Sequence, residues 1–181
     1  MTAQTTIKRL REQVTELQKQ LRVAVLGDLS WMQEVTDRNR PTLERPWAVE
    51  VDGEPWAIAT EGYMLVAVQG PNKFKPVPPP LDTSLAALHW HSPTLVHQAT
   101  LDMEGLRQWL QDCTGPYVLV CGVSQNPRFL MRALNNLPNG AITVGQEKRE
   151  GLQALYYLGA GWRIVLMSGS PSREYEAKLP S

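Results

Sequence analysis

The sequence predicts an α+β fold, made of two tandem βαβββ units behind an amphipathic N-terminal helix. Three strand-like runs, WAVEV, PWAIAT and YMLVAVQG, follow one another between residues 47 and 70. They are separated by Asp52–Gly53 and Glu61–Gly62, and such dipeptides between apolar runs are typical of β-hairpins. A helix, a turn and further strands follow one another again over residues 126–167. This repeated order of elements predicts the duplicated architecture.

The first unit is predicted to span residues 22–70. RVAVL at 22–26 indicates a short strand, and Asp28 is a suitable N-cap for the next element. Leu29, Met32 and Val35 recur at helical spacing and predict a helix that ends near Arg38. The three strands described above complete the unit.

Residues 71–98 are predicted to form a proline-rich linker and an extended segment. PNKFKPVPPPL favours polyproline geometry and therefore a rigid connector. The three histidines, His89, His91 and His97, lie in the second part of this stretch. An HxH pair on a strand can bind a metal, but no third ligand of a suitable kind lies nearby, so we predict no metal site and no cofactor.

The second unit is predicted over residues 99–167 and contains an extra helix. Asp102 is a suitable cap for that helix, and YVLVCGV at 117–123 predicts one buried strand. Asn126 as N-cap and Pro127 at the first helical position predict a second helix. Its apolar residues recur at helical spacing, and Pro138 and Gly140 terminate it before three strands that end at Met167. Residues 168–181 are predicted to be a flexible tail.

The N-terminal residues 1–21 carry a coiled-coil-like pattern of apolar side chains. The steps between them are three, four, three and four residues, which places them on one seam of a helix. A helix of this length is marginal in water, so it needs a partner. That partner is either a second copy, the body of the chain, or another protein. The seam residues are Ile7, Leu10, Val14, Leu17 and Leu21.

Composition excludes several classes of function. The chain has 181 residues, with 18 basic and 18 acidic side chains, so its formal net charge is zero. Its two cysteines are too few for a disulfide scaffold and predict a cytoplasmic protein with reduced thiols. Without a long apolar run or a catalytic constellation, we predict neither a membrane span nor an enzyme. A small hydrolase has only weak support.

Two segments resemble bacterial DNA sliding clamps, the beta-clamp family of polymerase processivity factors. ATEGYML at 59–65 resembles the family's Ala-Thr-Asp-Gly strand–turn–strand motif. RFLMRALNNL at 128–137 resembles its last inner helix, and IVLM follows in the expected order. The resemblance covers residues 27–167. It implies the tandem βαβββ units of a clamp domain.

This sequence departs from the family pattern in three ways. It has about one clamp-like domain, whereas bacterial clamp protomers carry three. The closing Met-Pro-Met-Arg-Leu pattern is replaced by Met167-Ser168-Gly169-Ser170. Residues 84–114 have no clear counterpart. A short, phage-type member of the family fits these features.

The resemblance implies two sites. Clamps face duplex DNA with basic inner helices that cross the phosphate backbone without sequence readout. Here the candidates are Arg38, Arg40, Arg128 and Arg132, although arginines on helices are also common as plain solvated residues. Clamps also bind client proteins in an apolar pocket. Carried over position by position, that pocket contains Thr60, Gly62, Tyr63, Leu65, Val165 and Met167, which could equally well only fill a turn and the core.

Two functions follow from these expectations. The first is a sliding-clamp-like processivity factor in DNA replication, which binds duplex DNA non-specifically and a DNA polymerase or another replication protein. About six copies would form a ring of family size, and the N-terminal seam could help to assemble this homo-oligomer. The alternative is a clamp-fold adaptor that binds a replication or transcription protein through its N-terminal helix without encircling DNA. Zero net charge favours the adaptor, and the arginine pair favours the ring.

Overall fold

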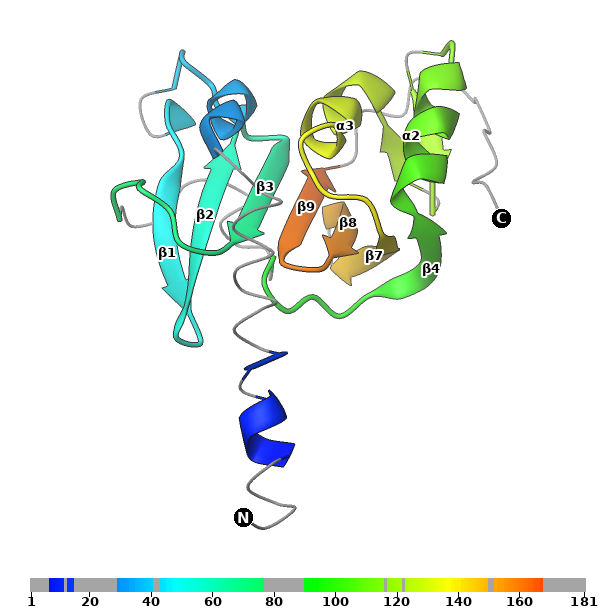
Figure 1. The fold of residues 1–181 in the computed structure, drawn as a ribbon. Coiled ribbons are helices and arrows are strands. Elements are labelled where there is room, and N and C mark those ends of the chain that lie inside the picture. The colour runs from blue at the N-terminus through cyan, green and yellow to red at the C-terminus, as the bar shows by residue number, and fades with distance from the viewer. Residues whose placement is uncertain are drawn as a thin grey trace.

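The computed structural model describes residues 7–11, 13–14, 29–40, 43–76, 90–115, 117–121, 123–149 and 152–167. Seven strands form one antiparallel sheet in the order β1-β2-β3-β9-β8-β7-β4 (Figure 1). A separate two-stranded hairpin joins β5 to β6. The elements are η1 (Leu29–Val35), β1 (Trp47–Val51), β2 (Glu54–Thr60), β3 (Met64–Gln69), β4 (Val96–Asp102), α2 (Met103–Asp112), β5 (Val118–Val120), β6 (Val123–Gln125), α3 (Pro127–Leu134), β7 (Ala141–Arg149), β8 (Leu152–Gly159) and β9 (Trp162–Met167).

Six of the seven strands form two three-stranded meanders joined edge to edge, and β4 pairs with β7 at the outer edge of the second. β1, β2 and β3 follow one another in the first half, and β7, β8 and β9 do so in the second. β3 and β9 then pair antiparallel, with Met64 opposite Leu166 and Leu65 opposite Val165. Each half therefore presents its third strand to the other, and the two meanders lie in mirrored order across this junction.

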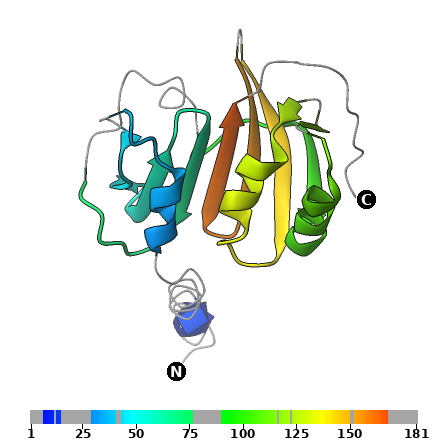
Figure 2. The same ribbon diagram turned by 90° about the horizontal axis from the view of Figure 1, so that it is seen from above.

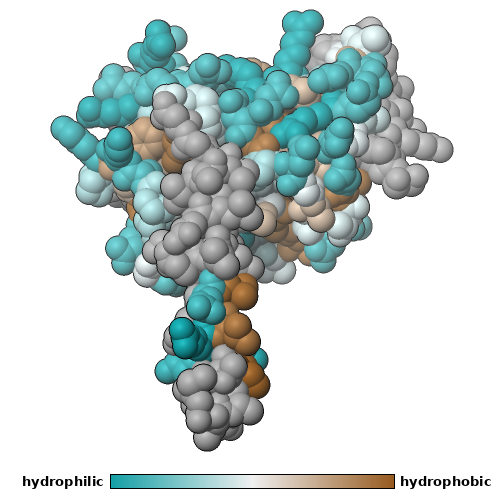
Figure 3. All heavy atoms as spheres, viewed as in Figure 1, coloured by the Kyte–Doolittle hydropathy of each residue, from teal (hydrophilic) through white to brown (hydrophobic). Residues whose placement is uncertain are grey.

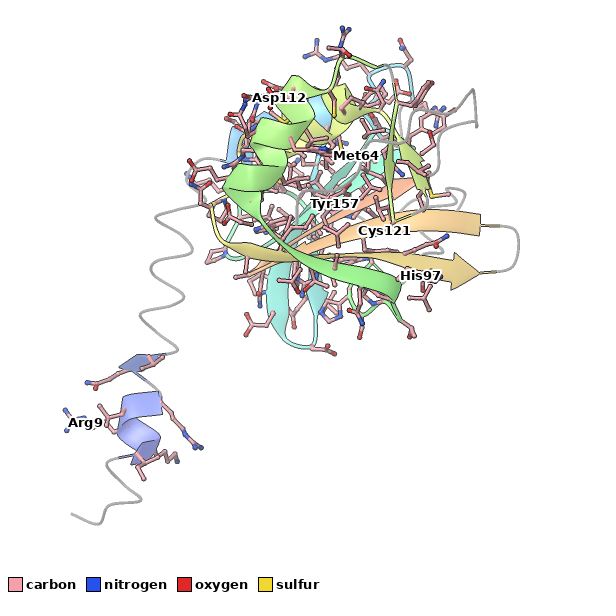
Figure 4. All side chains as sticks on the ribbon, turned by 90° about the vertical axis from the view of Figure 1, so that its right-hand side faces the viewer. Arg9, Met64, His97, Asp112, Cys121 and Tyr157 are labelled. Atoms are coloured by element: carbon pink, nitrogen blue, oxygen red, sulfur yellow. The ribbon has the colours of Figure 1, made fainter. Side chains whose placement is uncertain are left out.

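The three helical elements η1, α2 and α3 lie on one side of the sheet (Figure 2). Their buried side chains form one core with alternate residues of the strands, including Met64, Val66 and Tyr157. Figure 4 shows Met64 and Tyr157 in the interior, between the helices and the strands. Because successive strand residues point to opposite faces, this single layer of helices buries only one set of them.

The opposite face of the sheet, called the back face here, has its own apolar cluster. Trp56, Leu65 and Val165 belong to it and are almost fully buried. Residues 90–95 cover part of this face, and the ring of Trp90 lies edge-on to that of Trp56 with centroids 5.4 Å apart. The sheet is thus buried on both faces near the junction of the two halves.

Several local predictions are confirmed. The side chain of Asp102 caps α2 by accepting a hydrogen bond from the Gly105 N–H at 3.0 Å. Asn126 caps α3 in the same way through the Arg128 N–H, and Pro127 occupies the first turn. The two hairpin turns predicted in the first half lie at Asp52–Gly53 and Glu61–Gly62.

Three predictions about elements were wrong or incomplete. The element at Leu29–Val35 is a 3₁₀ helix that ends before Arg38; its apolar residues, spaced by three, share one edge of such a helix. Residues 117–123 do not form one strand, because the chain reverses at Cys121, whose φ is 48°, between β5 and β6. The linker prediction missed β4, an edge strand whose side chains are mostly exposed and therefore give little apolar signal.

Other predictions fall outside the described residues. These are the strand at 22–26, the cap at Asp28, the part of the linker at residues 77–89 with His89, the seam residues Leu17 and Leu21, and the tail at 168–181. The second half also carries α2 and the β5–β6 hairpin in addition to a helix and three strands. Within the described part of the chain, no helix is long and apolar enough to cross a membrane.

Candidate functional site

A pocket lies where the two halves of the sheet meet, on the side that carries the helices. We call it the helix-side pocket; its volume is about 250 Å³. The turn between β2 and β3, the end of β9, the β5–β6 hairpin and the first turn of α3 all contribute to it. The lining residues are Glu61, Tyr63, Met64, Tyr117, Gln125, Asn126, Phe129, Leu166 and Met167.

Thr60 fixes the turn that forms one wall of this pocket. Its hydroxyl donates to the Met64 carbonyl at 2.7 Å and accepts from the Gly62 N–H at 3.0 Å. Gly62 has a φ of +99°, a backbone conformation that residues other than glycine rarely adopt. The Met167 N–H donates to the Tyr63 carbonyl at 2.8 Å and ties the end of β9 to the same turn. The pocket wall is therefore held by hydrogen bonds from both halves.

Two aromatic side chains stand exposed at the pocket. Tyr63 is 63% exposed and Phe129 is 38% exposed. Most aromatic side chains in the described part of the chain are buried or partly buried, so exposure of two at one cavity sets this surface apart. Exposed aromatic residues beside a pocket are typical anchors for a partner.

Polar atoms in the same pocket lack hydrogen-bond partners. The carboxamide nitrogen of Gln125 is buried and unpaired, and Gln125 as a whole is only 3% exposed. The Oε1 atom of Glu61 is also buried and unpaired, whereas its Oε2 atom accepts from Arg132 at 2.8 Å. Buried polar groups normally find partners, and an unpaired one costs stability. A bound group that could hydrogen-bond to these atoms would remove that cost.

The residues carried over from the clamp resemblance divide between the two faces. Tyr63 and Met167 line the helix-side pocket, and Thr60 and Gly62 build its turn. Leu65 and Val165 point to the back face, where they are 3% and 0% exposed within the second core cluster. Alternation does not account for this separation, because residues two apart on a strand share a face. Tyr63 instead lies in the turn before β3, and Met167, the last residue of β9, also packs against the back-face cluster. Sequence reasoning missed Gln125 and Phe129 as pocket residues. It counted Phe129 only among the apolar residues of the helix and made no prediction for Gln125.

The four arginines proposed to face DNA differ in their partners. Arg132 forms an ion pair with Glu61, donates to the Glu34 carbonyl and packs over the Phe129 ring at 5.1 Å. Arg40 pairs with Asp37 at 3.2 Å. Arg38 and Arg128 are exposed, and neither guanidinium has a hydrogen bond or ion pair within the described residues. Two of the four positive charges are thus already compensated.

A second hollow, of about 690 Å³, lies between the end of α2 and α3, and Arg128 and Arg132 line it. Cys113 is also on its wall. Both cysteines are free, and burial raises the pKa of each thiol; for Cys113 the Asp112 carboxylate adds to this effect. Reactive cysteines have a lowered pKa, so these thiols do not have the character of nucleophiles. Within the described residues, no group of three or more potential ligands could hold a metal ion.

Comparison with protein-family profiles gives no match, and comparison with curated protein sequences gives none. Among solved structures, the chain is similar to a DNA polymerase III subunit beta DnaN sliding clamp from Bartonella birtlesii LL-WM9, with a TM-score of 0.55 and 10% identity. It is also similar to a Helicobacter pylori beta clamp bound to a DNA ligase peptide, with a TM-score of 0.54 and 8% identity.

Each of these alignments covers 84% of this chain and 64% of the clamp. The chain therefore spans less than two thirds of the length of the clamps that it resembles. Identity at this level supports a statement about fold, and the mixed α+β, mostly antiparallel architecture described above agrees with it. The protein has a fold similar to that of bacterial DNA sliding clamps.

Proposed function

We propose that this chain is a clamp-fold protein of DNA replication that binds a client protein through the helix-side pocket. The observation that carries the proposal is an apolar cavity with two exposed aromatic side chains and unpaired polar atoms from Gln125 and Glu61. A cavity of about 250 Å³ is too small for most drug-sized ligands. It fits one or two side chains of a short peptide, which would serve as anchors.

The clamp fold supports a role in replication, and one of the similar clamps carries a DNA ligase peptide. A peptide-binding role needs no catalytic group, and we propose that the chain is not an enzyme. The client is proposed to be a polymerase or another replication protein. Recognition would rest on a side chain inserted between Tyr63 and Phe129, with its polar atoms bonded to Gln125.

A selection from a displayed library of random short peptides tests this proposal. We expect enriched peptides whose binding is lost in Phe129→Ala, because that change removes one aromatic wall. Leu119→Ala is a matched control: Leu119 is 37% exposed, close to the 38% of Phe129, but lies outside the pocket. Failure to enrich any peptide, or equal binding to both variants, would contradict the proposal.

Duplex DNA is a second candidate partner, which the exposed and unpaired Arg38 and Arg128 favour. Phosphate contacts from arginines bind DNA without sequence preference and weaken steeply with salt. Retention of the chain on circular and linear duplexes at several salt concentrations distinguishes a closed ring around DNA from binding to the DNA surface. Loss from linear DNA alone indicates a closed ring, equal retention indicates surface binding, and no retention removes the DNA role.

A further inference from the structure

The N-terminal helical residues 7–11 and 13–14 expose an apolar stripe. Ile7, Leu10 and Val14 are 51%, 54% and 52% exposed. These residues extend away from the body of the molecule in Figure 1, and Figure 3 shows their hydrophobic side chains along one side of the helix. Arg9 lies on the same projecting segment in Figure 4. A contiguous apolar stripe in water is typical of a surface that binds another helix.

The spacing of the apolar residues specifies the kind of helix pairing. Taking Ile7 as heptad position a places Ile7, Val14 and Leu21 at a, and Leu10 and Leu17 at d. Leu17 and Leu21 lie outside the described residues and enter through the sequence spacing alone. β-branched residues at a combined with leucine at d favour two parallel strands over three or four. Two of the three a positions are β-branched here, and both d positions are leucine.

The residues that flank the seam suit a second copy of the same chain. In this heptad frame, positions e and g hold Arg11 and Gln18, and Gln13 and Gln20. In a parallel pair, Arg11 at e of one chain faces Thr6 at g of the other. No like charges then oppose each other across the seam. The remaining charged residues, Lys8, Arg9, Glu12, Glu16 and Lys19, fall at the outer positions b, c and f.

We infer that two copies of this chain associate through a parallel two-stranded coiled coil whose seam includes Ile7, Leu10 and Val14. The apolar pattern in the sequence spans only about two heptads, so we expect the association to be weak and to depend on protein concentration. Such a dimer carries two clamp-fold bodies, each with its own helix-side pocket. A client with two binding segments then binds with an avidity that can exceed the single-site affinity by about 10²–10⁴. The dimer itself does not depend on the proposed client function.

Sedimentation equilibrium of the full chain over a range of concentrations tests the inference. We expect the mass to rise from that of the 20.3 kDa monomer to twice this value. Leu10→Glu and Val14→Glu place a charge in the seam and should each leave a monomer at every concentration. Thr15→Glu adds the same charge at outer position b and should leave the dimer intact. Near-ultraviolet circular dichroism checks that the folded body is unchanged.

A wild-type chain that stays monomeric, or that forms trimers or tetramers, overturns the inference. A dimer that survives Leu10→Glu overturns it as well, because the interface then lies elsewhere. Orientation is tested with Ile7→Cys in a chain also carrying Cys113→Ser and Cys121→Ser. A parallel pair brings the two position-7 residues together, so oxidised glutathione should give a disulfide-linked dimer. Lys8→Cys at an outer position is the control, and an uncrosslinked Ile7→Cys dimer rules out the parallel arrangement.

Discussion

The helix-side pocket and the four arginines proposed to face DNA, Arg38, Arg40, Arg128 and Arg132, differ in how completely their polar groups are satisfied. Arg132 and Arg40 already have carboxylate partners. In the pocket, the Gln125 amide nitrogen and the Glu61 Oε1 atom have none, and two aromatic side chains are exposed. A folded protein keeps unpaired buried polar atoms only at a cost to its stability, and such sites are often functional. This difference between the pocket and the arginines favours protein recognition over DNA binding as the function of the chain.

The double variant Tyr63→Ala with Phe129→Ala has the largest expected effect. Aromatic anchors typically contribute about 2 kcal/mol each, so we expect peptide affinity to fall by about 1,000-fold. Titration calorimetry with a peptide selected on the wild-type chain measures the loss. The Leu119→Ala control should change affinity by less than about twofold. An equal loss in control and variant would show that the pocket is not the binding surface.

Gln125→Leu should change stability and peptide binding in opposite directions. Removal of a buried, unpaired amide should raise the free energy of unfolding by about 1–2 kcal/mol. The same change should weaken peptide binding by about tenfold, because the bound group loses its hydrogen-bond donor. Chemical denaturation and calorimetry on one preparation give both values. A less stable protein with unchanged affinity would mean that Gln125 has only a structural role.

Arg128→Ala and Arg132→Ala form a matched pair on one helix. If the chain binds duplex DNA, Arg128→Ala should reduce the slope of log K against log salt by about 1, since it removes one phosphate contact. Arg132→Ala should change the slope less, because its guanidinium is engaged by Glu61 and Glu34. Filter binding at several salt concentrations measures both slopes. A larger effect of Arg132 would show that DNA breaks its ion pair.

Glu61→Gln has the smallest expected effect and probes the contact between pocket and arginine. The Arg132 side chain is 40% exposed, so solvent screens its ion pair with Glu61. We expect a loss of about 0.5–1 kcal/mol in the free energy of unfolding. A free Arg132 should also increase retention on duplex DNA at low salt. Unchanged retention would show that Arg132 does not contact DNA.

Much of the fold could be predicted from local sequence signals. The caps at Asp102 and Asn126 and the turns at Gly53 and Gly62 depend on short-range chemistry, and all four are present. The reversal at Cys121 could not be foreseen, because a non-glycine residue at positive φ has no strong sequence signal. The edge strand β4 was missed because its exposed side chains lack the alternation of a half-buried strand.

The candidate site was predicted only in part, for a reason of geometry. Transfer from a resemblance selected both Tyr63 and Leu65, but Tyr63 belongs to the turn before β3 and lines the pocket, whereas Leu65 lies within β3 and is buried on the back face. Gln125 could not be identified because its role depends on the β5–β6 hairpin, which brings it to the end of β9 from a distant part of the chain. The ion pair of Arg132 with Glu61 joins residues 71 positions apart and leaves no local sequence signal.

The central claim is that a client peptide binds on the helix side of the sheet. Backbone and side-chain amide ¹H–¹⁵N spectra of the full chain, recorded during titration with a selected peptide, test it most directly. We expect the side-chain amide signals of Gln125 to shift together with the backbone signals of Tyr63 and Phe129, while Leu65 and Val165 remain unchanged. Shifts confined to Leu65, Val165 and the tryptophans of the back face would contradict the claim.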